Sequence, residues 1–255
     1  GDLSVRAEVA GPPEIRELAA SFNEMADRLG RIIEQQRAFA GDASHQLRTP
    51  LTALRLRLER AATEVVNDPD AALGNVEAAM AEADRLRRLI EQLLQLARSE
   101  GAIMQTTRVD LTALLRSRFN DWTALAEERG DVLTCSVPDG LVVDTVAPAV
   151  EQIVDNFIDN AIEYTPSGTS IEVGAVRVGD RIEISVRDTG LGMSASSRSR
   201  AFDRFWRGAE ASTRTEGTGL GLAIVQQLAH VISGECELRD NTPSGVVAVL
   251  TIPAK

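Results

Sequence analysis

The sequence predicts an α plus α/β protein: an antiparallel helical hairpin that dimerises into a four-helix bundle, followed by an α/β sandwich. Three observations predict this class. Residues 14–98 carry long helical periodicity, residues 106–255 alternate short β-like runs with helices, and residues 99–102 are typical of a helix end and a linker. A chain of 255 residues is long enough for two or three small domains.

Composition and charge exclude several classes of protein. Hydrophobic residues make up 44% and charged residues 25%, which is ordinary for a globular protein and argues against disorder. A net charge of −11 with only 4% aromatic residues gives neither the basic patch nor the stacking platform of a nucleic-acid binder. Cys135 and Cys236 are too few for a disulfide framework or a zinc site. No apolar run reaches the roughly 18–20 residues that cross a bilayer, and a chain that begins at Gly1 is expected to be a fragment.

The first unit shows a heptad pattern in two helical segments. Apolar residues recur every three or four positions from residue 22 to 43, with Gln36 as the one polar position, and from 54 to 65; an added step between the two stretches forms a stutter. Residues 67–70 break the helix, and a second heptad-like segment follows over residues 73–97. Because such a hairpin cannot bury its apolar seam alone, we expect a homodimeric four-helix bundle.

The second unit is expected to be a mixed sheet with helices on one face. The predicted helices lie near 110–129, at 147–163 and from 217–221 to about 232. The predicted strands lie at 131–137, 141–144, 170–178, 181–187, 235–239 and 245–252, with a polar stretch at 194–216. Residues 179–180 are typical of a hairpin turn between two of these strands.

His45 lies within the stutter of the first helical segment. The core positions are Ala43 and Leu47, so at about 100° per residue the imidazole points away from the seam. Thr49 follows on the same face, and Pro50 predicts a bend one turn after the histidine. An exposed neutral imidazole can attack an electrophilic phosphorus, although a lone histidine on a helix is more often an ordinary solvated side chain.

Asn156 and Asn160 lie one turn apart in the predicted helix 147–163, opposite most of its apolar residues. Asparagine is a mediocre helix former, so two of them on one face indicate a function. Side-chain amide oxygens are hard ligands that suit Mg²⁺. The competing interpretation is a polar helix face in contact with solvent.

Two glycine-containing motifs flank an aromatic segment. In residues 188–192, a carboxylate at a strand end can accept a hydrogen bond from the amine of adenine, although an Asx-capped turn fits equally well. In residues 217–222, glycine-rich backbone before a helix favours an anion such as a polyphosphate, but the motif lacks a preceding strand and a P-loop lysine. The aromatic segment 201–208 has small polar flanks, typical of a lid or of a surface loop.

Taken together, these motifs resemble a bacterial sensor histidine kinase of two-component signalling. The resemblance covers residues 15–255, and residues 45–50, 155–161, 188–192, 201–208 and 217–222 match the family's boxes in order. Residues 13–26 are similar to the second half of a HAMP signal-relay module. The resemblance implies a HAMP-like segment at 1–34, a dimerisation and phosphotransfer domain at 35–100, and a catalytic ATP-binding domain of the histidine kinase, Hsp90 and gyrase type at 106–255.

The resemblance also implies roles for individual residues. His45 would be phosphorylated by ATP, and Thr49 would position water for dephosphorylation of the partner. Asn156 and Asn160 would hold Mg²⁺ and the phosphates. Asp188 would recognise adenine beside Gly190, Gly192 and Tyr164, while Gly217, Thr218, Gly219, Leu220 and Gly221 would lie near the phosphates and Arg204 or Arg207 would reach the γ-phosphate.

Two positions depart from the family pattern. The family usually has Glu or Asp directly after the histidine; Gln46 can orient the ring but carries no charge, so we expect slower autophosphorylation. Glu163 stands where the family often has Lys or Arg, and it either weakens ATP binding or pairs with an arginine of the lid.

The leading hypothesis is a homodimeric kinase that passes its phosphoryl group to an aspartate of a response regulator receiver domain and also removes it. It would be the cytoplasmic portion of an inner-membrane sensor whose upstream membrane region is absent from this chain, and it would bind no nucleic acid. A phosphatase-dominant or weakly active scaffold is the alternative, supported by Gln46 and Glu163. An ATPase related to chaperones, gyrase or mismatch-repair proteins is disfavoured by the helical hairpin. Phosphorylation in cis or in trans depends on the connection around residues 67–72.

Overall fold

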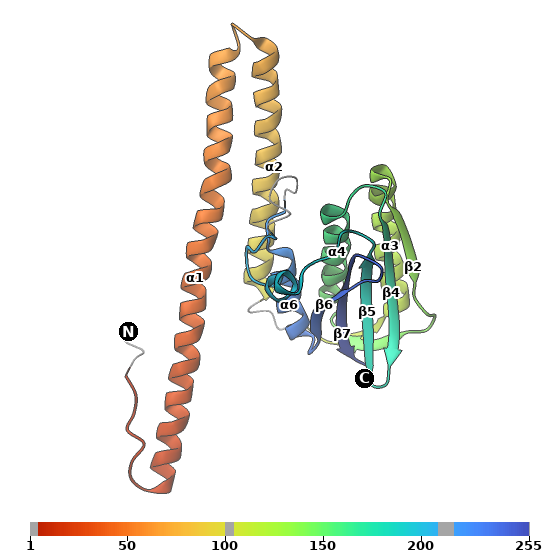
Figure 1. The fold of residues 1–255 in the computed structure, drawn as a ribbon. Coiled ribbons are helices and arrows are strands. Elements are labelled where there is room, and N and C mark those ends of the chain that lie inside the picture. The colour runs from red at the N-terminus through yellow and green to blue at the C-terminus, as the bar shows by residue number, and fades with distance from the viewer. Residues whose placement is uncertain (1–4, 100–104, 209–216, 255) are drawn as a thin grey trace. The chain divides into compact units, whose positions relative to one another are not determined.

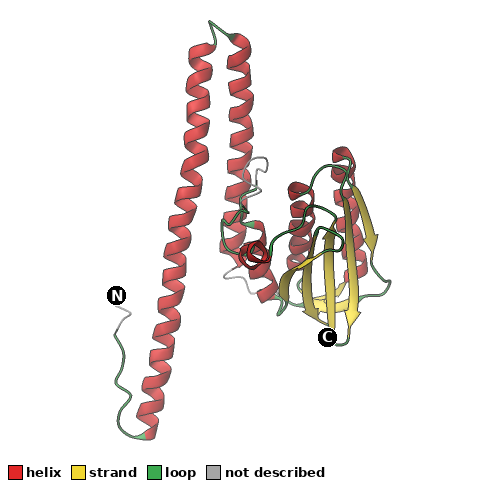
Figure 2. Cartoon of the chain, viewed as in Figure 1, coloured by secondary structure: helices red, strands yellow, loops and turns green. Residues whose placement is uncertain are grey.

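A computed structural model of the chain describes residues 5–99, 105–208 and 217–254. The chain divides into two compact units, Gly1–Arg87 and Arg88–Lys255. Figure 1 traces the elements of each unit, and Figure 2 distinguishes their helices from their strands. Along the described part of the chain, no helix is both long and apolar enough to span a membrane.

The first unit is built on two helices, α1 (Pro13–Glu64) and α2 (Pro69–Ser99), the second of which extends into the next unit. The helix break predicted at residues 67–70 is confirmed, and the Asp68 carboxylate accepts a hydrogen bond from the Ala71 N–H at 3.0 Å. Asn75 donates to Glu64 at 2.8 Å, which ties the two helices together beside the turn. α1 runs through Pro50 as one helix.

The second unit contains a mixed five-stranded sheet with the order β2-β4-β5-β7-β6. Its strands are β2 (Val132–Ser136), β4 (Ser170–Val178), β5 (Arg181–Asp188), β6 (Glu235–Asp240) and β7 (Val246–Pro253), and only β2 and β4 pair in parallel. The helices α3 (Leu111–Arg129), α4 (Ala147–Tyr164) and α6 (Gly221–Val231) lie on one side of it (Figure 1). The inward side chains Ile171, Ile182 and Ile184 are fully buried, so the core lies between this sheet face and the helices.

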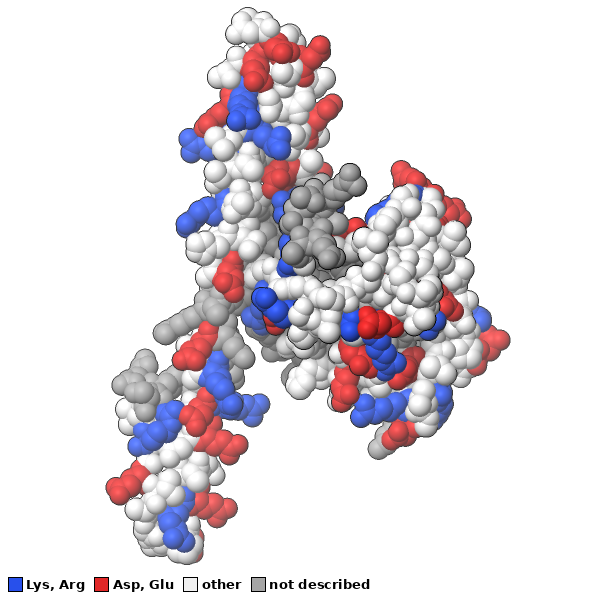
Figure 3. Space-filling model, viewed as in Figure 1, with Lys and Arg blue, Asp and Glu red and all other residues white. Residues whose placement is uncertain are grey.

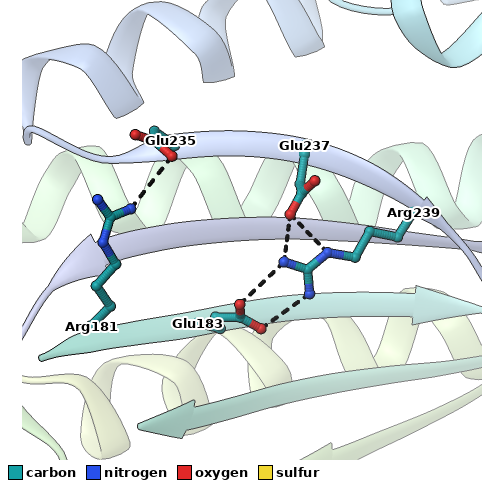
Figure 4. A network of polar contacts seen from close by, with 5 residues as sticks. All are labelled: Arg181, Glu183, Glu235, Glu237 and Arg239. Atoms are coloured by element: carbon teal, nitrogen blue, oxygen red, sulfur yellow. Dashed lines mark hydrogen bonds and ion pairs between the residues drawn. The ribbon is translucent and has the colours of Figure 1, made fainter. Parts of the chain in front are cut away.

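The opposite sheet face carries a network of ion pairs, drawn in Figure 4. Arg239 on β6 contacts Glu183 on β5 through two N–H groups, each 3.1 Å from a carboxylate oxygen, and it also pairs with Glu237. Strand alternation places Val249 on this same face, yet it is only 1% exposed. The long charged side chains therefore lie over an apolar strip of β7 that is withdrawn from water.

The fold class predicted from the sequence is confirmed for the hairpin and for the α/β unit, with element ends within a few residues. Two short elements were missed: β1 (Thr107–Asp110), which pairs with β3 (Val142–Thr145), and α5 (Ala195–Arg200) inside the predicted polar stretch. Only Val109 of β1 is buried, and α5 buries no side chain, so neither carries a periodic signal. Residues 209–216 of the predicted lid lie outside the described residues.

Charged side chains are distributed over both units. Figure 3 shows acidic and basic side chains intermixed along the helices and over the drawn face of the α/β unit.

Candidate functional site

The helix α4 positions the two asparagines. Its apolar side, which includes Ile153 and Phe157, is buried, while Asn156 and Asn160 are half-buried at the edge of that side. Asn156 donates from Nδ2 to the backbone carbonyl of Gln152 at 2.8 Å, which leaves its Oδ1 as the atom available to a ligand.

The amides of α4 face the start of α6. A Cβ added to Gly221 would lie 2.8 Å from Asn156 Oδ1 and 3.8 Å from both amide atoms of Asn160, so a side chain here would push against the Asn156 amide. Asn160 Nδ2 is buried and has no hydrogen-bond partner among the described residues. A buried polar atom without a partner beside a helix N-terminus is satisfied when an oxygen-rich anion binds there.

These amides fit a Mg²⁺–polyphosphate ligand better than a metal ion alone. No cluster of three or more His, Cys, Asp or Glu suited to a metal occurs among the described residues. Mg²⁺ is commonly held by one or two protein oxygens together with phosphate oxygens and water. Asn156 and Asn160 supply that kind of incomplete ligand set.

The second glycine motif, residues 217–222, contacts both Tyr164 and the aromatic segment 201–208. A Cβ on Gly217 would lie 1.9 Å from the Tyr164 hydroxyl oxygen and 3.1 Å from Glu163 Oε1. Gly219 has a φ of +71°, and its carbonyl accepts a hydrogen bond from the Phe205 N–H at 2.8 Å. The backbone of this motif therefore lies against both the end of α4 and the segment 201–208.

Tyr164 and its neighbours form a charged corner of this site. Burial and the neighbouring Glu163 carboxylate, opposed by Arg207, together raise the pKa of Tyr164 to about 12. The phenol therefore stays protonated and can donate a hydrogen bond. Of the two arginines predicted to reach a phosphate, Arg207 is thus placed beside Tyr164, while Arg204 is half-buried in the same segment.

Thr218 and Leu220 contribute differently from the glycines between them. The Leu220 side chain is fully buried in the core, so only its backbone can face a ligand. The Thr218 hydroxyl accepts a hydrogen bond from the Leu220 N–H at 3.3 Å and donates to the side-chain oxygen of Gln92 at the end of α2.

Asp188 ends β5 and is a buried residue, only 8% exposed. Its Oδ1 accepts hydrogen bonds from the Gly190 N–H at 2.9 Å and from the Val246 N–H at 3.3 Å. Burial raises the pKa of this carboxyl, and the backbone N–H donors oppose the increase. A carboxylate held in this way can accept a hydrogen bond from an amine through its remaining oxygen.

The three candidate residues of the hairpin lie together on one exposed surface of α1. His45, Gln46 and Thr49 are all exposed, whereas Ala43 and Leu47 are half-buried, as the periodicity predicts. The Thr49 hydroxyl donates to the His45 carbonyl at 3.4 Å, one turn earlier in the helix. The imidazole is thus accessible to a phosphate donor or acceptor.

Sequence reasoning missed two residues that contact Asp188. Asn241 donates from Nδ2 to the Asp188 backbone carbonyl at 2.7 Å. Gly245 has a φ of +114°, and a Cβ there would lie 2.0 Å from that same carbonyl oxygen. Residues 241–245 carry a turn signal in the sequence, but a turn signal does not say which distant strand the turn will contact.

Comparison with known protein families finds three matching segments. Residues 1–31 match the HAMP domain, residues 35–102 match the His Kinase A (phospho-acceptor) domain, and residues 145–255 match the histidine kinase-, DNA gyrase B-, and HSP90-like ATPase. The asparagines of α4, Asp188 and the second glycine motif all lie within the ATPase match, and His45 lies within the phosphoacceptor match.

Individual relatives agree with these matches. The chain is 33% identical over 99% of its length to the sensor histidine kinase MtrB of Mycobacterium leprae (strain TN), and 30% identical over 99% to the signal transduction histidine-protein kinase BaeS of Escherichia coli (strain K12). It spans about half of each relative, 47% and 54% respectively. The structure of histidine kinase ThkA in complex with response regulator protein TrrA shares the fold, with a TM-score of 0.73 and 18% identity over 92% of this chain and 66% of that one. The motifs, the three matched segments and these relatives together show that the chain belongs to the sensor histidine kinases.

Proposed function

We propose that this chain uses ATP to phosphorylate His45 and then passes the phosphoryl group to an aspartate of a response regulator receiver domain. The observation that carries the proposal is the close approach of the start of α6 to the side-chain amides of α4, where a buried amide nitrogen has no partner among the described residues. There, Asn156 Oδ1 and the partnerless Asn160 Nδ2 lie beside Gly221 at the N-terminus of α6, and glycine places no side chain between them and the helix end. His45 supplies an exposed nucleophile on the hairpin.

The proposed reaction is an in-line phosphoryl transfer. The lone pair of the neutral His45 imidazole attacks the γ-phosphorus of ATP, the bond from that phosphorus to the β,γ-bridging oxygen breaks, and ADP leaves. Gln46 orients the imidazole through its amide without accepting a proton. Mg²⁺, when bound, neutralises charge on the phosphates, with Asn156 and Asn160 as its protein ligands.

The phosphorylated imidazole is the donor in the second proposed step. An aspartate carboxylate of the receiver domain attacks the phosphorus, the phosphorus–nitrogen bond breaks, and His45 returns to its neutral form. The relative ThkA, whose solved structure includes a response regulator, supports such a partner for this chain. The exposed Thr49, one turn after His45, is the residue we assign to water positioning in the reverse, phosphatase role.

We further propose a homodimer formed through the hairpin, in a sensor anchored in the inner membrane by a region outside this chain. An open apolar groove on α1 is lined mainly by Leu51, Leu54, Leu58 and Ala62. Helices with such an exposed apolar stripe are completed by a partner helix. The proposed domain boundaries are 1–34, 35–100 and 106–255.

The first test is incubation with Mg²⁺ and γ-labelled ATP. We expect acid-labile label on the wild-type chain and none on His45→Ala. The matched control is His230→Ala, since the chain has only these two histidines and His230 lies in the last turn of α6. Label that persists in His45→Ala, or that is lost equally in His230→Ala, would contradict the assignment.

The alternative, a phosphatase-dominant scaffold, has two observations in its favour. Gln46 lacks the charge that a general base requires, and Glu163 places a carboxylate beside Gly217 at the proposed phosphate end. Demonstrated ATP binding without label on His45, together with removal of phosphate from a phosphorylated receiver domain, would favour this alternative.

A further inference from the structure

We propose that the turn between β6 and β7, residues 241–245, is a specificity-determining part of the nucleotide site. In this inference, which rests on the proposed ATP-binding function, the turn holds Asp188 so that one carboxylate oxygen faces the adenine 6-amino group. Asn241 is its central positioning residue, acting through Asp188 rather than on the base itself.

The contacts around Asp188 come mainly from this turn and the residue after it. Asn241 Nδ2 donates to the Asp188 carbonyl at 2.7 Å, and the Val246 N–H donates to Oδ1 at 3.3 Å. Together with the Gly190 N–H on Oδ1 at 2.9 Å, these donors fix both the backbone and one oxygen of the side chain. These hydrogen bonds therefore orient the other carboxylate oxygen, Oδ2, which is the one left to contact a ligand.

The backbone of the turn lies against both ends of the first glycine motif. A Cβ on Gly245 would lie 2.0 Å from the Asp188 carbonyl oxygen, and a Cβ on Gly192 would lie 3.3 Å from the Gly245 carbonyl oxygen. With a φ of +114° at Gly245, this approach is open only to glycine. Residues 188–192 therefore cannot shift without displacing the turn.

The turn is itself held at its base and across its opening. The Asn241 N–H donates to the Gly245 carbonyl at 3.0 Å, which closes the turn. Asp240, the last residue of β6, pairs with Arg198 of α5, and Arg198 also donates to the Met193 carbonyl at 2.6 Å. One side chain thus connects the base of the turn to the residue that follows the first glycine motif.

This arrangement predicts a selective effect on base recognition. Without the Asn241 amide, the Asp188 carbonyl loses a donor in a part-buried setting, and the peptide that carries the carboxylate relaxes to find another. This relaxation weakens the hydrogen bond from the adenine 6-amino group, whereas the proposed phosphate contacts lie elsewhere, on α4 and the second glycine motif. ATP binding should therefore weaken more than binding of a purine without a 6-amino group.

The test measures the dissociation constants of ATP and of purine ribonucleoside triphosphate, which lacks the 6-amino group, on the full chain. In Asn241→Asp, an acceptor of the same shape replaces the donor, and we expect ATP binding to weaken about tenfold while the second ligand changes less than about twofold. Ser244→Ala, at an exposed position of the same turn, is the matched control and should leave both constants unchanged.

Equal weakening of both ligands, or an unchanged ratio in a folded variant, would overturn the inference. Thermal unfolding checks that the variant is folded, and Asn241→Ala, which removes the donor without adding charge, decides the matter if Asn241→Asp does not fold. A wild-type chain that binds neither ligand would contradict the proposed function itself. If the Asn241 variants keep the wild-type preference for ATP over purine ribonucleoside triphosphate, only the role of the turn is overturned.

Discussion

The helical hairpin and the α/β unit bury their apolar side chains to very different extents. On the hairpin, Met25, Leu51 and Met80 are 60%, 56% and 65% exposed. In the α/β unit, Ile153 and Ile184 are completely buried. The α/β unit therefore has the core of a domain that folds by itself, whereas the hairpin has an exposed apolar surface of the kind that the proposed dimer would cover.

The largest expected effect follows from charging the exposed seam of the hairpin. In a Leu51→Asp, Leu58→Asp double variant, two carboxylates would have to be buried in the proposed dimer, so we expect it to dissociate into monomers. Analytical ultracentrifugation should show the molecular mass halved, and the unfolding transition of the hairpin should fall by more than about 10 °C and lose its dependence on protein concentration. The transition of the α/β unit should not move.

Arg57→Asp is the control for this pair, because Arg57 is exposed on the same helix and the change introduces the same carboxylate. It should leave the mass unchanged. A double variant that remains dimeric would show that the groove on α1 is not the dimer contact.

A second effect sharpens the comparison within the α/β unit, where Asp188 is a buried carboxylate that we propose recognises adenine. Asp188→Asn retains the acceptor for Gly190 and Val246 but removes the charge, so we expect ATP to bind about 30-fold more weakly. The same change should raise the Tm of the nucleotide-free unit by about 2–4 °C, equivalent to roughly 1 kcal/mol in a unit of this size.

The sign of the stability effect follows from the direction of the pKa shift. Because burial raises the pKa of Asp188 in the folded state, the native protein binds this proton more tightly than the unfolded chain does. The free-energy cost of burying the Asp188 charge is absent when the pH lies below the pKa of this carboxyl in the unfolded chain. It is complete when the pH lies above the pKa of the same carboxyl in the folded protein. The Tm gain of Asp188→Asn should therefore be present at neutral pH and vanish in acid; a gain that grows toward low pH would contradict this account.

The hairpin allows a smaller, gain-of-rate prediction at the residue after the phosphoacceptor. Gln46→Glu introduces a carboxylate that can accept the imidazole proton and raise its nucleophilicity, so we expect the initial rate of autophosphorylation to rise about fivefold. Rapid-quench measurement at saturating ATP separates this rate from ATP affinity, which should not change. Gln46→Met, which is neutral and of similar size, should not accelerate the reaction. An unchanged rate in Gln46→Glu would refute the idea that the missing charge at position 46 slows autophosphorylation.

The smallest effect is expected on the outer sheet face, where Arg239 pairs with Glu183 and Glu237 (Figure 4). Arg239→Met keeps much of the aliphatic cover but removes the charge. Since the Arg239 side chain is 43% exposed, we expect a loss of about 0.5 kcal/mol or less in the free energy of unfolding.

The Arg239–Glu183 pair contributes to stability with the sign opposite to that of the Asp188 charge, although both contributions fade in acid. Arg239 lowers the pKa of Glu183, so the pairing stabilises the fold above the unfolded pKa of Glu183 and is lost as the pH falls through its folded value. The difference in Tm between wild type and Arg239→Met should also shrink at high salt. A difference that persists in acid would point to packing rather than to charge.

Much of the molecule was predictable because its signals are local. The α1–α2 break at residues 67–70, the hairpin turn at residues 179–180 and the exposure of His45 follow from proline, glycine and a periodicity of three to four residues. β1 and α5 were not predicted, because four to six residues with one buried side chain or none are too short to show a period.

The sequence by itself determined the two fold units, the order of the motifs and the residue types available for chemistry, since each depends on neighbours within one turn or one strand. Tertiary structure alone decided which distant segments meet. It set Gly221 against the asparagines of α4, and it brought the turn at residues 241–245 onto Asp188, more than fifty positions earlier. The strand order β5-β7-β6 is what brings that turn to the end of β5, and strand order is a property of the assembled sheet that no local pattern encodes.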